Sequence, residues 1–164
     1  MISRRNLLIG LMPFALNGCG FRLKDSNLLA GSMPESLQID TTDQFSPFIK
    51  NLIRQMKNQG TKVVERNAKH TLKLTPPIAS KRILGSISGG DQTELSLKIT
   101  YSLITSNLTT LIPETIIKSS LIYLDSGSNN SAEDQRIEQF RRSLEIDLLR
   151  QIIPSIRARY GKAN

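Results

Sequence analysis

The chain has 164 residues, a formal net charge of +8, one cysteine, one histidine and no tryptophan. This length predicts a single compact domain with its own core, and a lone cysteine excludes an internal disulfide. One histidine and one cysteine are too few for a zinc site built from these residues, so we expect no metal, no cofactor and no enzymatic activity.

The first 19 residues have the pattern of a lipoprotein export signal. Arg4 and Arg5 precede the short apolar run 7–16, which is followed closely by Gly18 and Cys19. At about 1.5 Å of rise per residue the run covers roughly 15 Å, about half of a hydrocarbon core, and is too short to span a membrane. We predict a cleaved signal peptide over residues 1–18 and a covalent lipid on Cys19, with acyl chains of the palmitate type. The alternative is a buried free thiol after ordinary cleavage.

Residues 19–34 are expected to form the lipid anchor and a polar tether, and residues 35–164 a single folded domain. Gly20 stands where an Asp would retain a lipoprotein in the inner membrane, which favours the outer membrane of a Gram-negative cell. Export argues against nucleic acid as a partner of the basic chain. Anionic lipid or a phosphorylated glycolipid is the expected target, and a charge that serves solubility alone is the alternative.

The folded part begins with a short strand and a helix. Leu37 and Ile39 alternate with polar residues, which predicts a strand over residues 37–40. Ser46 and Pro47 have the order of an N-cap and a first helical residue. The apolar residues that follow at helical spacing are Ile49, Leu52, Ile53 and Met56, and Gly60 is expected to end this helix.

Three further strands are expected. Leu72, Leu74 and Ile78 alternate with polar residues, and Pro76 and Pro77 would place this strand at a sheet edge or give it a bulge. Residues 85–90 predict a turn, and residues 115–124 a last strand after a turn near residues 107–113. The clearest strand covers residues 94–103, with Leu95, Leu97, Ile99, Tyr101 and Leu103 on one face and Glu94, Ser96, Lys98, Thr100 and Ser102 on the other.

The last element is a long amphipathic helix that begins near Ser131, where Asp134 completes a capping box. Pro154 is expected to kink or end this helix around Ile153. The order β-α-β-β-β-α predicts an α+β two-layer sandwich, with both helices on one face of a four-stranded sheet. The polar second face would be solvated or would lie against another polar surface, such as the lumen of a large β-barrel.

The sequence offers no catalytic constellation. His70 is expected on the surface just before the second strand. Ser86, Ser88 and Gly89 do not form a nucleophile motif, and residues 85–90 do not match a phosphate-binding loop. A non-catalytic binding module is therefore the expected class.

Two segments resemble the LptE family of lipopolysaccharide-assembly lipoproteins, also called RlpB. They are Gly18-Cys19-Gly20-Phe21-Arg22-Leu23-Lys24 and Ile153-Pro154-Ser155-Ile156-Arg157-Ala158. The order of elements, and Gln92-Thr93 before the long alternating strand, are similar to the family as well. The resemblance implies an outer-membrane lipoprotein that plugs the β-barrel LptD as a heterodimer. It also implies help with barrel assembly, binding of lipopolysaccharide and its insertion into the outer leaflet.

Two basic positions of the family are absent, because the corresponding stretches read Ser88-Gly89-Gly90-Asp91 and Ser131-Ala132-Glu133. Our hypothesis is that Lys81 and Arg82, near the same hairpin tip, contact lipopolysaccharide instead, and the alternative is a solvated basic pair. The rival function is a periplasm-facing lipoprotein that carries or chaperones an acyl-chain ligand. That function would favour an internal cavity lined by residues such as Leu97, Ile99, Phe140 and Leu144.

Overall fold

The computed structural model describes residues 33–127 and 131–163. The predicted signal peptide, Cys19 and nearly all of the predicted tether lie outside these residues. The described elements are β1 (Ser36–Asp40), α3 (Pro47–Asn58), β2 (Lys62–Val63), β3 (His70–Leu74), β4 (Ile78–Ile87), β5 (Gly90–Thr105), β6 (Thr110–Asp125) and α4 (Ser131–Ala163).

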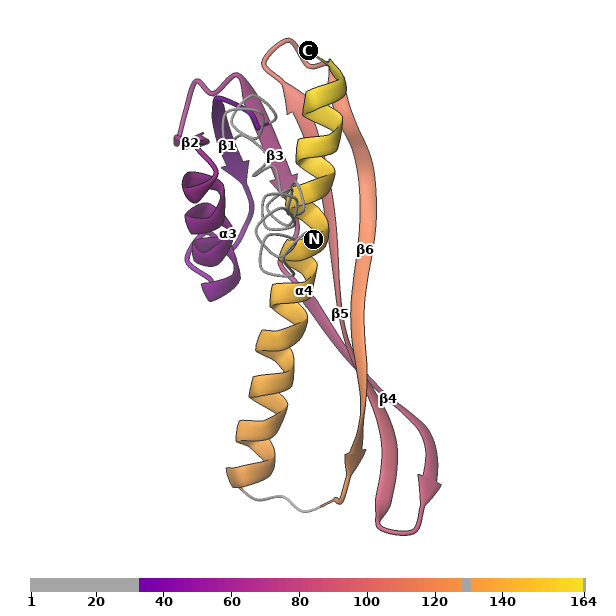
Figure 1. Cartoon of the computed structure of the whole chain (residues 1–164). Coiled ribbons are helices and arrows are strands. Elements are labelled where there is room, and N and C mark those ends of the chain that lie inside the picture. Colours follow the sequence, from indigo (N-terminus) through magenta and orange to yellow (C-terminus); the bar gives the residue numbers. More distant parts are fainter. Residues whose placement is uncertain (1–32, 128–130, 164) are drawn as a thin grey trace, which may run out of the picture.

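The sheet is built around β5. Along one side, β6 pairs with β5 antiparallel from Asp125 opposite Asp91 to Thr110 opposite Ile104. Along the other side, β4 and β3 pair antiparallel with successive parts of β5. The sheet continues from β3 through β1 to β2 in parallel pairings. Two long strands, β5 and β6, therefore run the length of the molecule (Figure 1).

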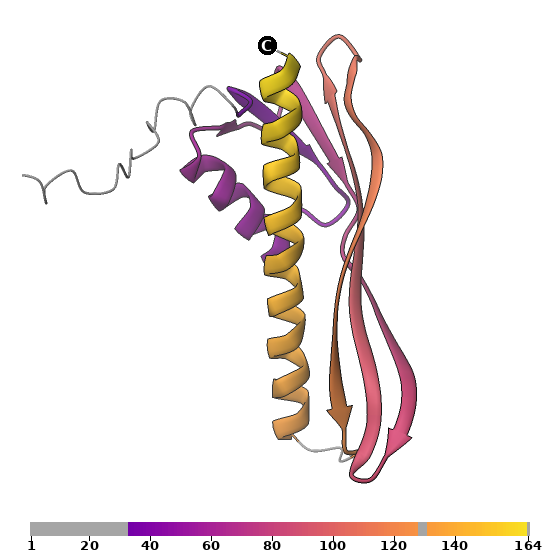
Figure 2. The same ribbon diagram turned by 45° about the vertical axis from the view of Figure 1, so that its right-hand side comes forward.

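The two described helices, α3 and α4, lie on the same face of this sheet, as the two views in Figures 1 and 2 show. The predicted start of α3 is confirmed, since the Ser46 hydroxyl accepts a hydrogen bond from the backbone N–H of Ile49 at 3.3 Å. Its predicted apolar stripe is largely buried, and Leu52 and Met56 are completely so. The helix N-cap and the amphipathic pattern thus determine both where α3 begins and which face it turns to the sheet.

The core lies between the helices and the apolar face of β5. The five predicted inward residues of β5 are all buried, and Leu97, Ile99 and Leu103 have no exposed surface. Leu148 and Leu149 of α4 are as fully buried and belong to the same cluster. The α+β two-layer arrangement, with two helices on one sheet face, is confirmed.

Within residues 33–127 the sheet has six strands rather than the predicted four. One reason is the pair Pro76-Pro77, which separates β3 from β4 because neither proline can donate to the β5 ladder. A second is β2, a two-residue strand beside β1. The predicted second strand is thus two strands on the same side of β5.

Two turn predictions need correction. Residues 85–87 belong to β4, and the turn consists of Ser88 and Gly89 alone. Gly90 has a φ of 142°, and a Cβ there would collide with the carbonyl oxygen of Asp125. The prediction of a turn as far as Pro113 is also wrong, since β6 already begins at Thr110. The proline is tolerated because β6 is an edge strand and its register shifts there.

Pro154 was predicted to kink or end the last helix around Ile153, and the predicted end is wrong, because α4 continues through Pro154 to Ala163. Pro154 is exposed, whereas Ile152, Ile153 and Ile156 on either side of it are buried. Ser155 is fixed as well, at 2.6 Å from the Tyr101 hydroxyl of β5. Packing on both sides of the proline therefore outweighs the tendency of proline to end a helix.

Candidate interaction surface

The hypothesised pair Lys81 and Arg82 lies within β4, so the two side chains point to opposite faces of the sheet. Lys81 is opposite Leu95, an inward residue, and its ammonium lies 2.6 Å from Oδ2 of Asp125. This hydrogen bond lowers the pKa of the Asp125 carboxyl and raises the pKa of Lys81. The structure therefore separates the two cations instead of joining them into one cluster.

Arg82 belongs to an ion-pair chain on the outer face, which is the sheet face without helices. Its guanidinium lies 3.3 Å from one oxygen of Glu94, and the other oxygen accepts a 2.9 Å hydrogen bond from Lys118. The hydrogen bond from Lys118 holds the pKa of Glu94 below its ordinary value. Lys98 stands directly opposite Lys118. The outer face thus has the polar and charged character predicted for it, with cations in excess.

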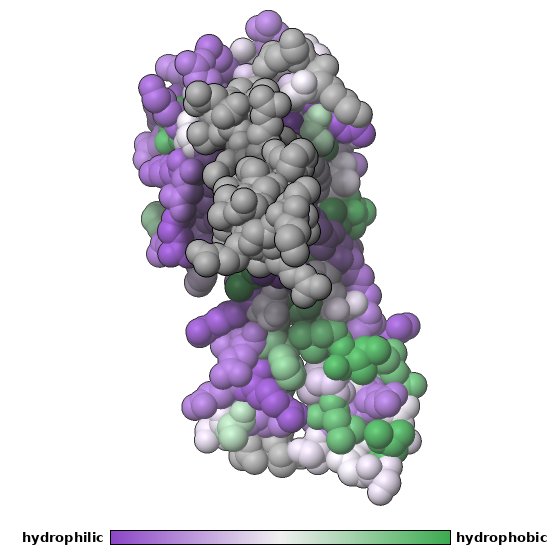
Figure 3. Space-filling model, viewed as in Figure 1, coloured by the Kyte–Doolittle hydropathy of each residue, from purple (hydrophilic) through white to green (hydrophobic). Residues whose placement is uncertain are grey.

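Next to these charges, aliphatic side chains are exposed on β4 and β6. Ile122 is opposite Glu94 and Leu124 is opposite Gln92, so both lie on the outer face. Figure 3 shows apolar residues gathered over the end of the molecule where β4 and β5 form their hairpin. Ile83 is opposite Thr93 and therefore lies on the inner face, whereas Ile78 and Ile116 lie farther from the hairpin, beside Lys98 and Thr100. The exposed aliphatic residues of the two strands, between 42% and 61% exposed in β4 and between 40% and 63% in β6, are Ile78, Ile83, Leu84, Ile87, Ile116, Ile122 and Leu124. We call these seven residues the aliphatic surface.

The helices do not cover this surface. Among the described residues α4 contacts β5 and β6 but makes no contact with β4. All ten residues of β4 are exposed, and its only partner strand within residues 33–127 is β5. A strand with two open faces and one free edge is an element that proteins usually cover or pair.

The inner side of the same end is closed by α4. Tyr123 of β6 packs against Phe140, with ring centroids 5.4 Å apart. Arg136 donates a 2.8 Å hydrogen bond to the carbonyl oxygen of Leu124 and lies 5.9 Å from the Tyr123 ring. The start of α4 is thereby tied to β6, which leaves β4 as the open side of the hairpin end.

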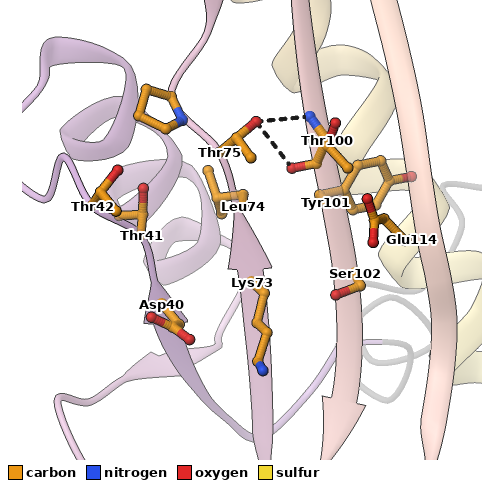
Figure 4. Close-up of a pocket in the computed structure, with 11 residues that line it drawn as sticks. Asp40, Thr41, Thr42, Lys73, Leu74, Thr75, Thr100, Tyr101, Ser102 and Glu114 are labelled. Atoms are coloured by element: carbon orange, nitrogen blue, oxygen red, sulfur yellow. Dashed lines mark hydrogen bonds between the residues drawn. The ribbon is translucent and has the colours of Figure 1, made fainter.

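A depression of about 310 Å³ lies on the outer face where β3 ends (Figure 4). Asp40, Lys73 and Ser102 are neighbours there by strand register. The Thr75 hydroxyl accepts a 3.0 Å hydrogen bond from the backbone N–H of Thr100, which secures the edge of the depression. The residues around it include neither histidine nor cysteine, and the arrangement has no nucleophile paired with a base.

His70 does not lie on the surface as predicted. It is only 8% exposed, and its ring meets Tyr160 of α4 edge to face at 5.1 Å. Its Nδ1 is buried and has no hydrogen-bond partner among the described residues. The sequence contained a sign of this burial that was missed. His70, Leu72 and Leu74 alternate along one strand, so their three side chains lie on the same inward face.

Within residues 33–127 and 131–163, no three residues of the metal-ligating types lie close enough to hold an ion. None of the helices in these ranges combines the length and the apolar character that crossing a bilayer requires.

The predicted cavity of an acyl-chain carrier is not seen at the residues named for it. Leu97, Ile99 and Leu144 are at most 2% exposed and pack in the core cluster, with Phe140 against it. These four residues do not line the depressions at the end of β3, between α3 and α4, along the start of α4 or beside β1.

No protein-family model matches the chain, and no curated protein is found to match it. Several solved structures share its fold. Rare lipoprotein B from Shewanella oneidensis is 14% identical, with a TM-score of 0.69 over 78% of this chain and 98% of that one. A minor lipoprotein from Acinetobacter baumannii is 15% identical, with a TM-score of 0.65 over 77% and 92%. An uncharacterized lipoprotein B from Nitrosomonas europaea is 20% identical, with a TM-score of 0.60 over 85% and 89%.

Proposed function

We propose that this chain is an outer-membrane lipoprotein of the LptE type. In this role it is anchored through lipid on Cys19 and occupies the lumen of the β-barrel LptD. It assists assembly of that barrel and the insertion of lipopolysaccharide into the outer leaflet. The shared fold with rare lipoprotein B supports the proposal, together with the resemblance of residues 18–24 and 153–158 to that family.

The observation that carries the proposal is the aliphatic surface beside the ion-pair chain. Seven exposed aliphatic side chains lie along β4 and β6, and Ile122 and Leu124 share the outer face with Arg82 and Lys118. Monomeric proteins seldom leave so many apolar side chains of neighbouring strands open, so a protein partner is the expected cover. The adjoining charges of Arg82, Glu94 and Lys118 would suit a partner wall that is polar in part, as the inner wall of a large barrel is. No observation on the described residues favours the acyl-chain carrier.

The first test is co-purification. The full chain, tagged and expressed in a Gram-negative host, is isolated from detergent-solubilised outer membranes, and its partner is identified by mass spectrometry. LptD in equal amount is the expected partner. The variant I122S/L124S should lose most of it, because removing two contact side chains of about 1.5–3 kcal/mol each weakens binding by well over tenfold.

The matched control is F45S/L108S, which removes two exposed apolar side chains that belong to neither β4 nor β6. It should retain the partner as the unchanged chain does. A chain that leaves the membrane without LptD, or two double variants that behave alike, would contradict the plug function.

The second test concerns Lys81 and Arg82. If they contact lipopolysaccharide, K81Q/R82Q should weaken its binding to the full chain by about tenfold or more, since two charge-assisted contacts are removed. The variant K73Q/R150Q changes one lysine and one arginine elsewhere and serves as control. If the unchanged chain and both variants bind lipopolysaccharide with equal affinity, Lys81 and Arg82 do not contact it. Their role is then limited to the ion pairs with Asp125 and Glu94.

A further inference from the structure

A second polar feature lies in the helix layer, between the first turns of α3 and the middle of α4. It is a groove of about 820 Å³. The lining residues are Pro47, Lys50, Asn51 and Arg54 of α3 and Glu138, Arg141, Arg142, Glu145 and Ile146 of α4. In Figure 3 hydrophilic side chains dominate this part of α4, in contrast to the hairpin end beside it.

The groove has more cations than carboxylates. On α4, Arg142 lies 3.3 Å from Glu138 and Arg141 lies 3.7 Å from Glu145. Within each of these pairs the positive and the negative charge cancel. On α3, Lys50 and Arg54 make no ion pair within the described residues, and Arg54 donates instead to Asn51 at 2.7 Å. Two positive charges in the groove are therefore uncompensated.

The position of α3 adds to this positive potential. Pro47 is the first residue of the helix and lines the groove, and the first turn of α3 contains no acidic residue. A helix N-terminus carries about half a positive charge, which an acidic side chain in the first turn often offsets. Here that partial charge adds to Lys50 and Arg54.

We propose that the groove between α3 and α4 binds a phosphate group. The planar guanidinium groups of Arg54, Arg141 and Arg142 can each present two parallel N–H donors to phosphate oxygens, and Lys50 supplies a further charge. The two uncompensated cations match the charge of a phosphate monoester, which lies between one and two negative charges near neutral pH. Pro47 and Ile146, which is 41% exposed, offer an apolar wall that could accept the group carrying the phosphate.

This site is separate from the aliphatic surface, because its lining residues belong to α3 and α4 and none belongs to β4 or β6. It does not depend on a barrel partner. The phosphate could belong to a lipid headgroup or be free in solution, and the two sources are distinguished by using two probes.

The test measures binding to the full chain in a neutral detergent by isothermal titration. The probes are inorganic phosphate and dihexanoyl phosphatidate, a short-chain lipid that dissolves below its micellar concentration. The groove variant is K50Q/R54Q, in which both residues are exposed and neither pairs with a carboxylate, so the fold should be kept. The control is K73Q/R150Q, which has the same change in charge. Circular dichroism and thermal melting verify that all three proteins are folded.

At least one probe should bind the unchanged chain and the control, and its affinity should fall about tenfold or more in K50Q/R54Q, because two charge-assisted contacts are lost. Binding of inorganic phosphate would assign the site to phosphate itself. Binding of dihexanoyl phosphatidate alone would assign it to a lipid headgroup. The inference is overturned if neither probe binds in the millimolar range, or if the groove variant and the control bind equally well.

Discussion

His70 is a buried titratable residue at the start of β3, so its ionisation directly affects the core. Burial lowers the pKa of His70 below its ordinary value, and the backbone hydrogen bond with Ser36 offsets this only in part. The charge of the adjacent Lys69 lowers it further, and the neighbour from α4 is the ring of Tyr160. No carboxylate hydrogen-bonds the imidazole in the described residues, so the folded chain favours its neutral form.

The stability of the protein should therefore fall as the pH is lowered below about 6.5, the ordinary pKa of histidine. The sign follows because the unfolded chain binds the proton at higher pH than the folded chain does, so acid favours unfolding. The free energy of unfolding, measured by urea denaturation between pH 7.5 and pH 5, should decrease. In H70F, which keeps an aromatic ring against Tyr160, this decrease should be smaller.

Other shifted groups change the stability below the range from pH 7.5 to pH 5, or change it in the opposite direction to His70. Hydrogen bonds from cations lower the pKa values of Glu35, Glu94 and Asp125, so these carboxyls destabilise the fold only at still lower pH. Burial raises the pKa of Glu145, and its protonation should relieve a penalty as the pH falls. A wild-type profile parallel to that of H70F would show that His70 does not contribute.

Packing beyond a single residue explains which elements the sequence predicted well. The helix α3 and the strand β5 could be predicted because Ser46, Gly60 and the alternation from Leu95 to Leu103 are local signals that agree with the tertiary structure. The full lengths of β4 and β6 could not, because both follow β5 through hydrogen bonds that no local pattern encodes. The aliphatic surface was missed for the same reason: only the strand register brings Ile122 beside Glu94, next to Arg82 of β4.

The proline in α4 shows how tertiary packing outweighs local preference. A proline inside a helix costs about 3 kcal/mol relative to alanine. Ending α4 before Pro154 would remove the fully buried Ile156 from the core and separate the half-buried Tyr160 ring from His70. A fully buried side chain of this size contributes about 1.5–3 kcal/mol, and the partial burial of Tyr160 adds to it. These contributions are comparable to the penalty, so the helix continues.

The variant P154A should therefore stabilise the protein by about 1–3 kcal/mol, since the proline ring is exposed and its loss leaves no cavity. The midpoint of urea denaturation reports the change, provided that the slope of the transition stays the same. A neighbouring variant, Y101F, removes the hydrogen bond to Ser155 and should cost about 1 kcal/mol. Lower stability of P154A would mean that the proline itself positions Ile156.

Buried side chains are distributed unevenly along the molecule. At the end with α3, β1 and β3, residues such as Leu37, Phe48 and Leu72 have 2% exposure or less. At the hairpin end the inner face is closed mainly by Leu95 and Tyr123, while β4 lies open on both faces. Local stability follows such differences in packing, so the free energy of opening should decrease from the α3 end toward the hairpin.

Amide hydrogen exchange of the full chain can detect this gradient. The amides of β4 that donate to β5 should exchange on the order of tenfold faster or more than those of β3, although both strands pair with the same neighbour. If the proposed partner binds the aliphatic surface, the β4 amides should exchange more slowly in the complex, because the hairpin could then open only after the partner dissociates. The amides of α3, far from that surface, should change little. If β4 is already as slow as β3 in the isolated chain, the hairpin is stable without a cover, and its exposed aliphatic residues lose their significance as a partner surface.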